Sequence, residues 1–371
     1  MTTGLRVLQV NSIFNGGGVD NQTLELARGL VDAGVETVLA VTANARMTPA
    51  AQAVSGLHVE MLPSERLAFA RELSRLVGRL RPAIVHVQHG KDYWPAIIAA
   101  GLAWTGARVV VSRHLMGVVS KPSRALLLRA ADVVAVSQAV RRVLEATLRG
   151  PAGRLHQIYG GVDCMRFQPP AAGITASAKA AHGWSADTVV FGVLGYFNPP
   201  RGKGQLEFLK AAEPVYRRYP QSRFLIVGAG GLQQPMQQMI EQAGMQEVCS
   251  IVPWQDDVRT VLAALDVLVY PAIEPEALGI ALWEAMACGL PVIGSALGGI
   301  PEAFIDRQHG RLLPADNVGM LVEAMSGLAA DATQRKLWGS TARRYVLGRF
   351  STPIHAANMI ALYRTILQRS R

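Results

Sequence analysis

This chain of 371 residues contains only three cysteines. It also lacks the clustered His, Cys and Asp residues and the acidic pairs that are typical of metal sites. The three cysteines lie far apart and are odd in number, which favours reduced thiols over a disulfide framework and gives no metal-ligand spacing. No Asp-x-Asp pair occurs in the sequence, and no His, Cys and Asp residues cluster along it. We therefore expect a protein without a metal or other cofactor.

The sequence also shows no typical membrane-spanning segment and no typical targeting segment. The two most apolar stretches, residues 95–111 and 277–299, each carry a charged residue and several glycines, which is atypical of a transmembrane helix. The amino terminus enters a strand pattern after five residues and lacks the regions of a signal peptide. These features predict a cytoplasmic protein. No nucleic-acid-binding module is recognisable, so we expect no nucleic-acid partner.

What the chain does contain is enough apolar sequence for two cores. Half of its residues are hydrophobic and 17% are charged, which together with the length predicts two folded domains. The net charge is +10, and residues 1–166 hold 19 Lys or Arg against 11 Asp or Glu, whereas residues 167–371 hold 18 against 16. The amino-terminal half is therefore expected to attract an anionic partner.

Short apolar strands alternate with helical patterns along both halves. The strands expected in the first half are residues 5–10, 36–41, 58–62, 84–88, 108–112 and 133–137. A second alternating series begins at Val189. Such alternation predicts an α/β fold of two Rossmann-like, doubly wound parallel sheets. We expect domains at residues 1–168 and 186–350, joined by a Pro-, Ala- and Gly-rich linker at 169–185.

A glycine-rich turn follows the first expected strand and precedes a helical pattern. It comprises Asn15, Gly16, Gly17 and Gly18. Glycines at such a position allow backbone N–H groups to approach an anion at the positive end of the helix. The turn has neither the spaced glycines of dinucleotide-binding proteins nor the Lys-Ser/Thr of a Walker loop. An unliganded tight turn is the alternative.

Two carboxylates stand eight residues apart in the stretch EPEALGIALWEAMACGLPVIGSALGGIPE, at Glu276 and Glu284. The pattern predicts a loop, a helix, a glycine stop at Gly289 and a strand. On a continuous helix the two carboxylates would lie roughly 12 Å apart along the axis, and within about 80° of one face. They are then placed to hold one elongated, hydroxyl-rich ligand, although an exposed amphipathic helix would show the same spacing.

This stretch resembles the signature of retaining glycosyltransferases of family 4, including its Gly298-Gly299-Ile300-Pro301-Glu302 continuation. The resemblance implies a GT-B fold, whose two domains face each other across a cleft, and a final helix at 351–371 that returns to the first domain. It further implies metal-independent transfer of a sugar from a nucleotide-diphosphate sugar to an acceptor hydroxyl, with retention at the anomeric carbon.

The resemblance also implies roles for single residues. Glu276 approaches the donor sugar, Glu284 accepts from the ribose, and Leu278 and Gly279 bind the donor. Gly16 and Gly17 lie near the donor phosphates. His114, in VVVSRHLMG, matches the histidine beside the donor sugar.

The same resemblance implies that two cationic side chains bind the donor diphosphate, and the candidates are Arg201 and Lys203. Lys203 matches the Lys-Gly of the family. The arginine that usually follows the preceding strand is absent, and Tyr196 and Phe197 stand there instead, so Arg201 is expected to replace it. Trp254 is a candidate neighbour of the nucleotide base, or a packing residue.

A basic amphipathic pattern at residues 64–81 places Arg71, Arg75 and Arg79 on one face. It indicates either an ordinary solvated helix or a surface for anionic lipid headgroups or a phosphate-bearing acceptor. The function favoured by all these features is a glycosyltransferase of cell-envelope polysaccharide, lipopolysaccharide or glycolipid biosynthesis. It would be cytoplasmic or peripheral at the inner membrane face, with a glycan or glycolipid acceptor. A sugar-nucleotide epimerase and a catalytically silent sugar-nucleotide-binding protein remain alternatives.

Overall fold

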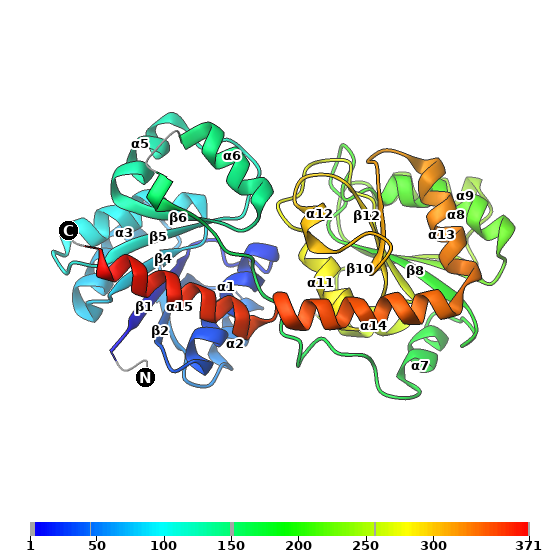
Figure 1. Ribbon diagram of the computed structural model, residues 1–371, viewed down its shortest axis with the longest axis horizontal. Helices are drawn as coiled ribbons and strands as arrows, with labels where there is room; N and C mark the ends of the chain where they lie inside the picture. Colours follow the sequence, from blue (N-terminus) through cyan, green and yellow to red (C-terminus); the bar gives the residue numbers. More distant parts are fainter. Residues whose placement is uncertain (1–3, 45, 149–151, 256, 370–371) are drawn as a thin grey trace. The chain divides into compact units, whose positions relative to one another are not determined.

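Two α/β units make up the chain in the computed structural model (Figure 1), which describes residues 4–44, 46–148, 152–255 and 257–369. Unit 1 comprises Met1–Asp163 and Phe350–Arg371, and unit 2 comprises Cys164–Arg349. Within the described ranges, no helix combines the length and the apolar character needed to cross a bilayer.

Unit 1 is built on a seven-stranded parallel sheet. Its strands are β1 (Arg6–Asn11), β2 (Glu36–Thr42), β3 (His58–Leu62), β4 (Ile84–Val87), β5 (Arg108–Arg113), β6 (Ala131–Ala135) and β7 (Leu155–Gln157). They lie in the order β3-β2-β1-β4-β5-β6-β7. The chain reverses its direction of travel across the sheet between β1 and β4, and open α/β sheets bind ligands at such a switch point. The turns after β1 and β4 are therefore candidate binding elements.

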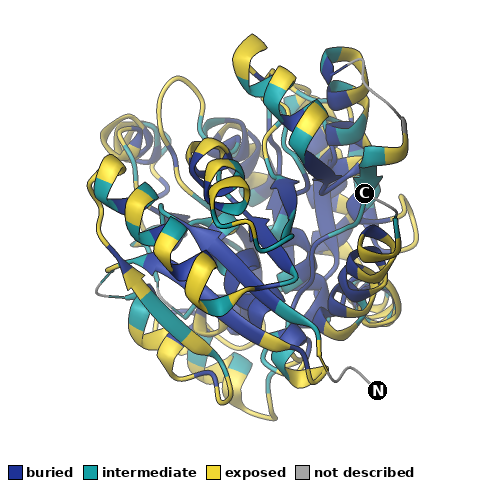
Figure 2. Cartoon of the chain, turned by 90° about the vertical axis from the view of Figure 1, so that its left-hand side faces the viewer, coloured by how far each residue is buried: buried dark blue, intermediate teal, exposed yellow. Residues whose placement is uncertain are grey.

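Helices cover both faces of this sheet. They are α1 (Gly18–Asp32), α2 (Met47–Gln52), α3 (Arg66–Leu80), α4 (Tyr93–Leu102), α5 (Lys121–Ala130), α6 (Gln138–Leu148) and α15 (Thr352–Gln368), with short 3-10 turns η1 (Gly90–Asp92) and η2 (Ala152–Arg154). The carboxyl-terminal helix α15 packs beside α1, and Met359 and Tyr363 share a buried cluster with Leu26 and Leu30. Figure 2 shows the central strands buried and the helices exposed along their outward faces.

Unit 2 repeats the plan with six parallel strands. They are β8 (Val189–Leu194), β9 (Ser222–Gly228), β10 (Cys249–Pro253), β11 (Val267–Tyr270), β12 (Val292–Ser295) and β13 (Gly310–Leu313), in the order β10-β9-β8-β11-β12-β13. The helices are α7 (Ile174–Ala180), α8 (Gln205–Arg218), α9 (Gln233–Gln242), α10 (Arg259–Ala264), α11 (Ile280–Ala287), α12 (Ile300–Ala303), α13 (Val318–Ala330) and α14 (Ala332–Arg349). Phe191, Phe208 and Phe224 anchor its core. Two Rossmann-like parallel-sheet domains, as expected from the sequence, are thus confirmed.

The boundaries between the units differ from the expected ones. Residues 169–185, expected as a linker, contain helix α7 and belong to unit 2. The segment is rich in alanine, whose helix propensity outweighs the turn signals of its Pro and Gly residues. Lys179 of α7 is buried and donates to Asp266 at 2.8 Å and to the carbonyl of Thr188 at 2.7 Å. These contacts fix the segment to the second core.

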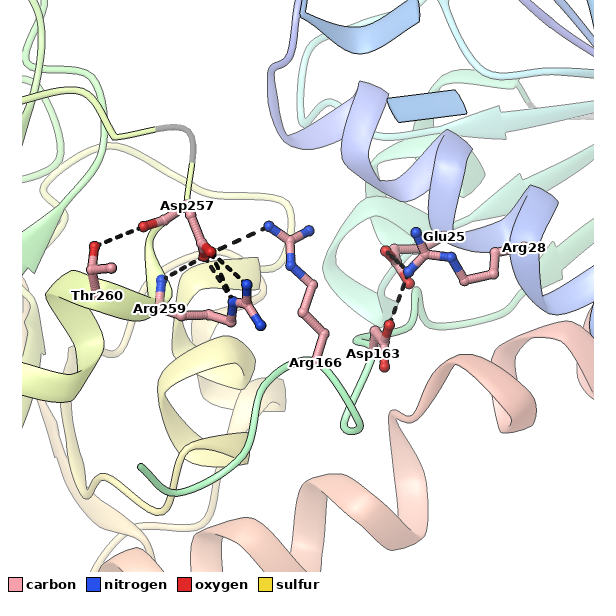
Figure 3. Close-up of polar contacts among 7 residues, drawn as sticks. All are labelled: Glu25, Arg28, Asp163, Arg166, Asp257, Arg259 and Thr260. Atoms are coloured by element: carbon pink, nitrogen blue, oxygen red, sulfur yellow. Dashed lines mark hydrogen bonds and ion pairs between the residues drawn. The ribbon is translucent and has the colours of Figure 1, made fainter. Parts of the chain in front are cut away.

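Ion pairs flank the first crossing between the units, and each lies within its own unit (Figure 3). In unit 1, Arg28 of α1 donates to Asp163 at 2.9 Å. In unit 2, Arg166 lies 3.9 Å from Asp257, which also pairs with Arg259 at 2.6 Å. The chain is therefore anchored at the last residue before the crossing, Asp163, and at the third residue after it, Arg166.

Candidate functional site

An ion pair between Lys203 and Glu276 is the centre of the candidate site in unit 2. Lys203 lies in the turn between β8 and α8, and Glu276 lies in the loop between β11 and α11. Their side chains are 31% and 20% exposed, so both groups remain accessible to a ligand. The structure therefore brings together the residue expected at the donor diphosphate and the residue expected at the donor sugar.

Glycines allow the backbone segments around this pair to approach each other. Gly204, directly after Lys203, has φ 87°, and a Cβ there would lie 1.9 Å from the carbonyl oxygen of Pro271. Gly298 has φ 59°, and a Cβ there would lie 2.3 Å from the carbonyl oxygen of Glu276. Only glycine fits such left-handed positions against a neighbouring backbone. The Lys-Gly and Gly-Gly motifs thus have a steric role in positioning the ion pair.

Gln205 fixes the turn that carries Lys203, and the sequence analysis missed it. Its side chain is fully buried. It accepts from the backbone N–H of Lys203 at 2.7 Å and donates to the carbonyl of Gly195 at 3.2 Å. A buried amide that satisfies two turn backbone groups holds the loop in one conformation. The available signal was a polar residue at the first helical position, immediately after Lys-Gly.

The expected helix through both glutamates is shorter than predicted. Helix α11 begins at Ile280, after Gly279 in the left-handed conformation with φ 77°, so Glu284 is helical and Glu276 is not. The spacing calculated for a continuous helix therefore does not apply. The predicted order of loop, helix, Gly289 stop and strand is observed, with the strand at Val292–Ser295.

Both glutamates influence the pKa of Tyr270, the buried last residue of β11. Burial, then Glu276 and then Glu284, raises the pKa of Tyr270 well above its usual value. The two carboxylates therefore face a common region even though only one lies on the helix. Leu278 is buried, so its side chain packs in the core and only its backbone is available to a ligand, as in Gly279.

Arg201 interacts with Asp316 and not with the Lys203–Glu276 pair. Its guanidinium donates to Asp316 at 3.3 Å, and both side chains are about half exposed. Asp316 follows β13 and has φ 57°. The structure thus gives Lys203, and not Arg201, the contact with the glutamate loop.

Tyr196 and Trp254 form a stacked aromatic pair close to the same turn. Their ring centroids are 4.9 Å apart and their planes differ by 4°. Tyr196 directly follows Gly195, whose carbonyl is bonded by Gln205. Tyr196 is 43% exposed, which leaves aromatic surface for a planar ligand. The sequence had offered Trp254 as a candidate beside the base, but not its stacking on Tyr196.

The glycine turn of unit 1 satisfies its own N–H groups. Asn15, Gly16 and Gly17 each donate a backbone N–H to one carboxylate oxygen of Asp20, at 2.9, 2.8 and 2.9 Å. The internal carboxylate thus occupies the donors that we expected to face an anionic ligand. Arg46 donates to the carbonyl of Gly16 at 2.6 Å, which places a guanidinium on this turn.

His114 follows β5 in unit 1 and is held by Gln88 after β4. Its Nε2 lies 3.0 Å from Gln88 Oε1, and because an amide oxygen only accepts, Nε2 carries the proton. Burial, reinforced by His355, His89 and Arg113, lowers the pKa of His114 to about 3. The ring is therefore neutral near pH 7, with Nδ1 as its acceptor atom.

Two other polar residues near these strand ends have structural partners. His86 is fully buried between the Tyr363 hydroxyl at 2.7 Å and the Ser112 hydroxyl at 2.8 Å, so its role is structural. Asp92 accepts from the backbone N–H of Ser12 at 2.8 Å, and burial raises its pKa. Among the described residues, no group of three or more His, Cys, Asp or Glu side chains is arranged as a metal site.

Two family models match the chain, one for each half. Residues 16–166 match the model described as Glycosyltransferase Family 4. Residues 176–345 match the model described as Glycosyl transferases group 1. The second match includes the Lys203–Glu276 pair, and the first includes the glycine turn and His114.

Named relatives and solved structures extend over most of the chain. A D-inositol 3-phosphate glycosyltransferase of Kribbella flavida is 28% identical and covers 94% of this chain and 91% of its own. A GDP-mannose-dependent phosphatidylinositol monomannoside mannosyltransferase of Mycolicibacterium smegmatis is also 28% identical and covers 81% of each. The crystal structure of Anabaena HepE with UDP and glucose has a TM-score of 0.84 at 19% identity, and it covers 97% of this chain and all of that one. The structural likeness shows a GT-B fold.

Proposed function

Because this chain belongs to the glycosyltransferases of group 1, family 4, we propose that it transfers a sugar from a nucleotide-diphosphate sugar to an acceptor hydroxyl with retention at the anomeric carbon. The single observation that carries the proposal is the ion pair of Lys203 with Glu276. It joins one cation and one carboxylate on two turns that glycines hold close together.

Lys203 and Glu276 would bind different parts of the nucleotide-sugar donor. Lys203 would bind the diphosphate and stabilise the charge that develops on it as the glycosidic bond breaks. Glu276 would accept from hydroxyls of the transferred sugar, and Glu284 from the ribose. Tyr196, stacked on Trp254, offers a flat surface for the base. Leu278 and Gly279 would contribute backbone groups at the start of α11.

No metal is needed in this proposal, because Lys203 and the backbone at the start of α11 supply positive potential for the diphosphate. Arg201 would join them only after leaving Asp316. On the side of unit 1, neutral His114 would orient the donor sugar. Gly16 and Gly17 would act near the phosphates through the Arg46 guanidinium that lies on their turn.

The acceptor that we propose is an anionic glycan or glycolipid of the cell envelope. Unit 1 holds 21 Lys or Arg against 11 Asp or Glu, whereas unit 2 holds 16 of each, so the whole net charge lies in unit 1. A phosphate-bearing acceptor is favoured by such a field. The relatives named for inositol phosphate and phosphatidylinositol mannoside acceptors support the same class.

A thermal-shift screen of the purified chain against UDP, GDP, ADP and CMP, and their common sugar conjugates, tests the donor. A ligand that binds the folded state raises the midpoint by mass action, so selective stabilisation by one nucleoside diphosphate identifies the base. The matching sugar nucleotide and a phosphoinositol acceptor are then incubated with the protein, and NMR of the product reports anomeric configuration. Interconversion of the sugar nucleotide without an acceptor would instead indicate an epimerase. Binding without any turnover would indicate a silent binding protein.

A further inference from the structure

Two buried glutamines in unit 1 form a hydrogen-bonded row that ends at His114. Gln9 lies in β1, Gln88 directly follows β4 and His114 directly follows β5, and the three strands are neighbours in the sheet. Nε2 of Gln88 donates to Oε1 of Gln9 at 3.1 Å, and Oε1 of Gln88 lies 3.0 Å from Nε2 of His114. We call Gln9 and Gln88 the amide row. It crosses the sheet at its switch point, where open α/β sheets bind ligands.

The amide row is shielded from water. Gln9 is fully buried and Gln88 is 4% exposed. Strands of a parallel sheet covered on both faces are usually apolar, and buried amides are costly unless they are hydrogen-bonded. Nε2 of Gln9 has no partner within the part of the chain that the structure describes, so one donor of the row is unsatisfied. Core stability alone therefore does not account for glutamine at these two positions.

Two contacts of Nε2 fix the direction of the Gln88 amide. One is the bond to Gln9 Oε1, and the other is the ring of His86, whose two nitrogens lie 3.4 and 3.5 Å away. Burial lowers the pKa of His86 to about 3, so this ring is neutral and offers an acceptor nitrogen. Both neighbours suit an N–H group rather than a carbonyl. The amide oxygen of Gln88 is therefore directed at His114.

The direction of this amide decides which nitrogen of His114 carries the proton. An amide oxygen only accepts, so the observed contact keeps the proton on Nε2 and leaves Nδ1 as an acceptor. A reversed Gln88 amide would donate to Nε2 of His114, and the proton of the neutral ring would then lie on Nδ1. His114 makes no other hydrogen bond to the described residues, so the amide row is what distinguishes the two forms.

We propose that Gln88 and Gln9 are positioning residues, which hold His114 as an acceptor for a hydroxyl of the transferred sugar. This inference rests on the proposed function, in which His114 orients the donor sugar. A sugar hydroxyl can donate to Nδ1, whereas an ionised carboxylate only accepts and cannot. The amide row would thus favour a neutral, hydroxyl-bearing sugar at this position of the site.

The position of the ring proton tests the proposal without any ligand. In the full chain labelled with ¹⁵N-histidine, long-range ¹H–¹⁵N spectra distinguish a protonated from an unprotonated Nδ1, and His114→Asn identifies the signals. We expect the Nε2–H form in the wild type. Gln9→Met removes the acceptor of Gln88 Nε2 and frees the amide to reverse, so part of His114 should carry its proton on Nδ1. Gln88→Met removes the contact with the ring and should also give both forms.

A matched control exists in the same unit. Gln157 of β7 accepts from Nε2 of Gln138 at 3.2 Å, and its own Nε2 lacks a partner among the residues that the structure describes, as in Gln9. Gln157→Met therefore removes the same two features away from the row and should leave the His114 signals unchanged. Gln9→Met removes one hydrogen bond together with one unsatisfied donor, so we expect this variant to fold.

Calorimetry then measures the effect of the proton position on the donor. Each variant of the amide row should bind the sugar nucleotide more weakly by at least the inverse of the fraction of His114 that keeps Nε2–H. That is roughly twofold where half of the rings have changed form. Affinity for the nucleoside diphosphate without the sugar should stay at the wild-type value, because only the sugar meets His114 in the proposed function.

Three results would overturn the proposal. They are a proton on Nδ1 in the wild type, unchanged His114 signals in both variants of the amide row, and equal weakening of the nucleoside diphosphate and the sugar nucleotide, which is what a purely structural role predicts. The ring measurement needs neither donor nor turnover. If no sugar nucleotide binds the wild type, the proposed function fails, and the spectra still decide whether the amide row sets the proton of His114.

Discussion

Replacing Gln205 by alanine should loosen the turn that holds Lys203. The side chain is buried and bonds two backbone groups, the N–H of Lys203 at 2.7 Å and the carbonyl of Gly195 at 3.2 Å. Leaving each without a partner costs about 1–3 kcal/mol, so we expect a loss of about 2–6 kcal/mol in the free energy of unfolding. For a unit of this size the thermal midpoint should fall by roughly 4–24 °C.

Binding should change together with stability, because the same hydrogen bonds position Lys203. We expect weaker binding of the nucleoside diphosphate identified in the donor screen, measured by calorimetry at a temperature where the variant is folded. Gln205→Glu keeps an acceptor for the N–H of Lys203 but sets a buried carboxylate against the carbonyl of Gly195, so its loss should be at least as large. Gln242→Ala, on the exposed end of α9, is the matched control. A Gln205→Ala variant within about 0.5 kcal/mol of this control, with unchanged affinity, would refute the reasoning.

Three further predictions concern the site and the core of unit 1. Glu284→Ala should weaken nucleoside-diphosphate binding in calorimetry without unfolding the chain, and unchanged affinity would reject its ribose role. Lys203→Ala should lose turnover in a coupled assay, whereas Lys336→Ala on the outside of α14 should not; a wild-type rate for the first would remove Lys203 from the diphosphate site. Burial lowers the pKa of His86 and His114 to about 3 and that of His355 to about 4. The unfolded chain therefore takes up protons first, and stability should be full above about pH 6.5 and fall by about 4 kcal/mol per pH unit near pH 5, measured by urea denaturation. A flat profile there would contradict neutral buried histidines.

The fold was predictable because its signals are local and repeated. Each expected strand is a short run of β-branched or other apolar residues, and each falls within a residue or two of an observed strand. Parallel strands buried on both faces give such runs wherever they occur. The unit boundary was less predictable. The segment containing Lys179 has the composition of a linker, but its buried contact with Asp266 is a tertiary interaction that composition does not encode.

Within the site, the motifs predicted the residue types better than their geometry. Lys203 and Glu276 are 73 residues apart in the chain, and their pairing depends on the order of β8 and β11 in the sheet. Arg201 and Lys203 are neighbours in sequence, yet Arg201 pairs with Asp316. Side chains that are close in the chain can thus face different loops, because a turn of a few residues reverses their direction.

The glycine turn of unit 1 has the predicted conformation, but its N–H groups have a different partner from the one expected. Gly16 and Gly17 form the turn before α1, as expected, but Asp20 accepts from both of their N–H groups. Asp20 stands three residues after Gly17, the position of an acidic residue in a capping box, so the signal was present in the sequence. With these donors occupied, the positive charge at the turn is that of Arg46 on the carbonyl of Gly16. An anion that binds there therefore does not find the N–H groups of Asn15, Gly16 and Gly17 free, and the Arg46 guanidinium is a cationic group within reach.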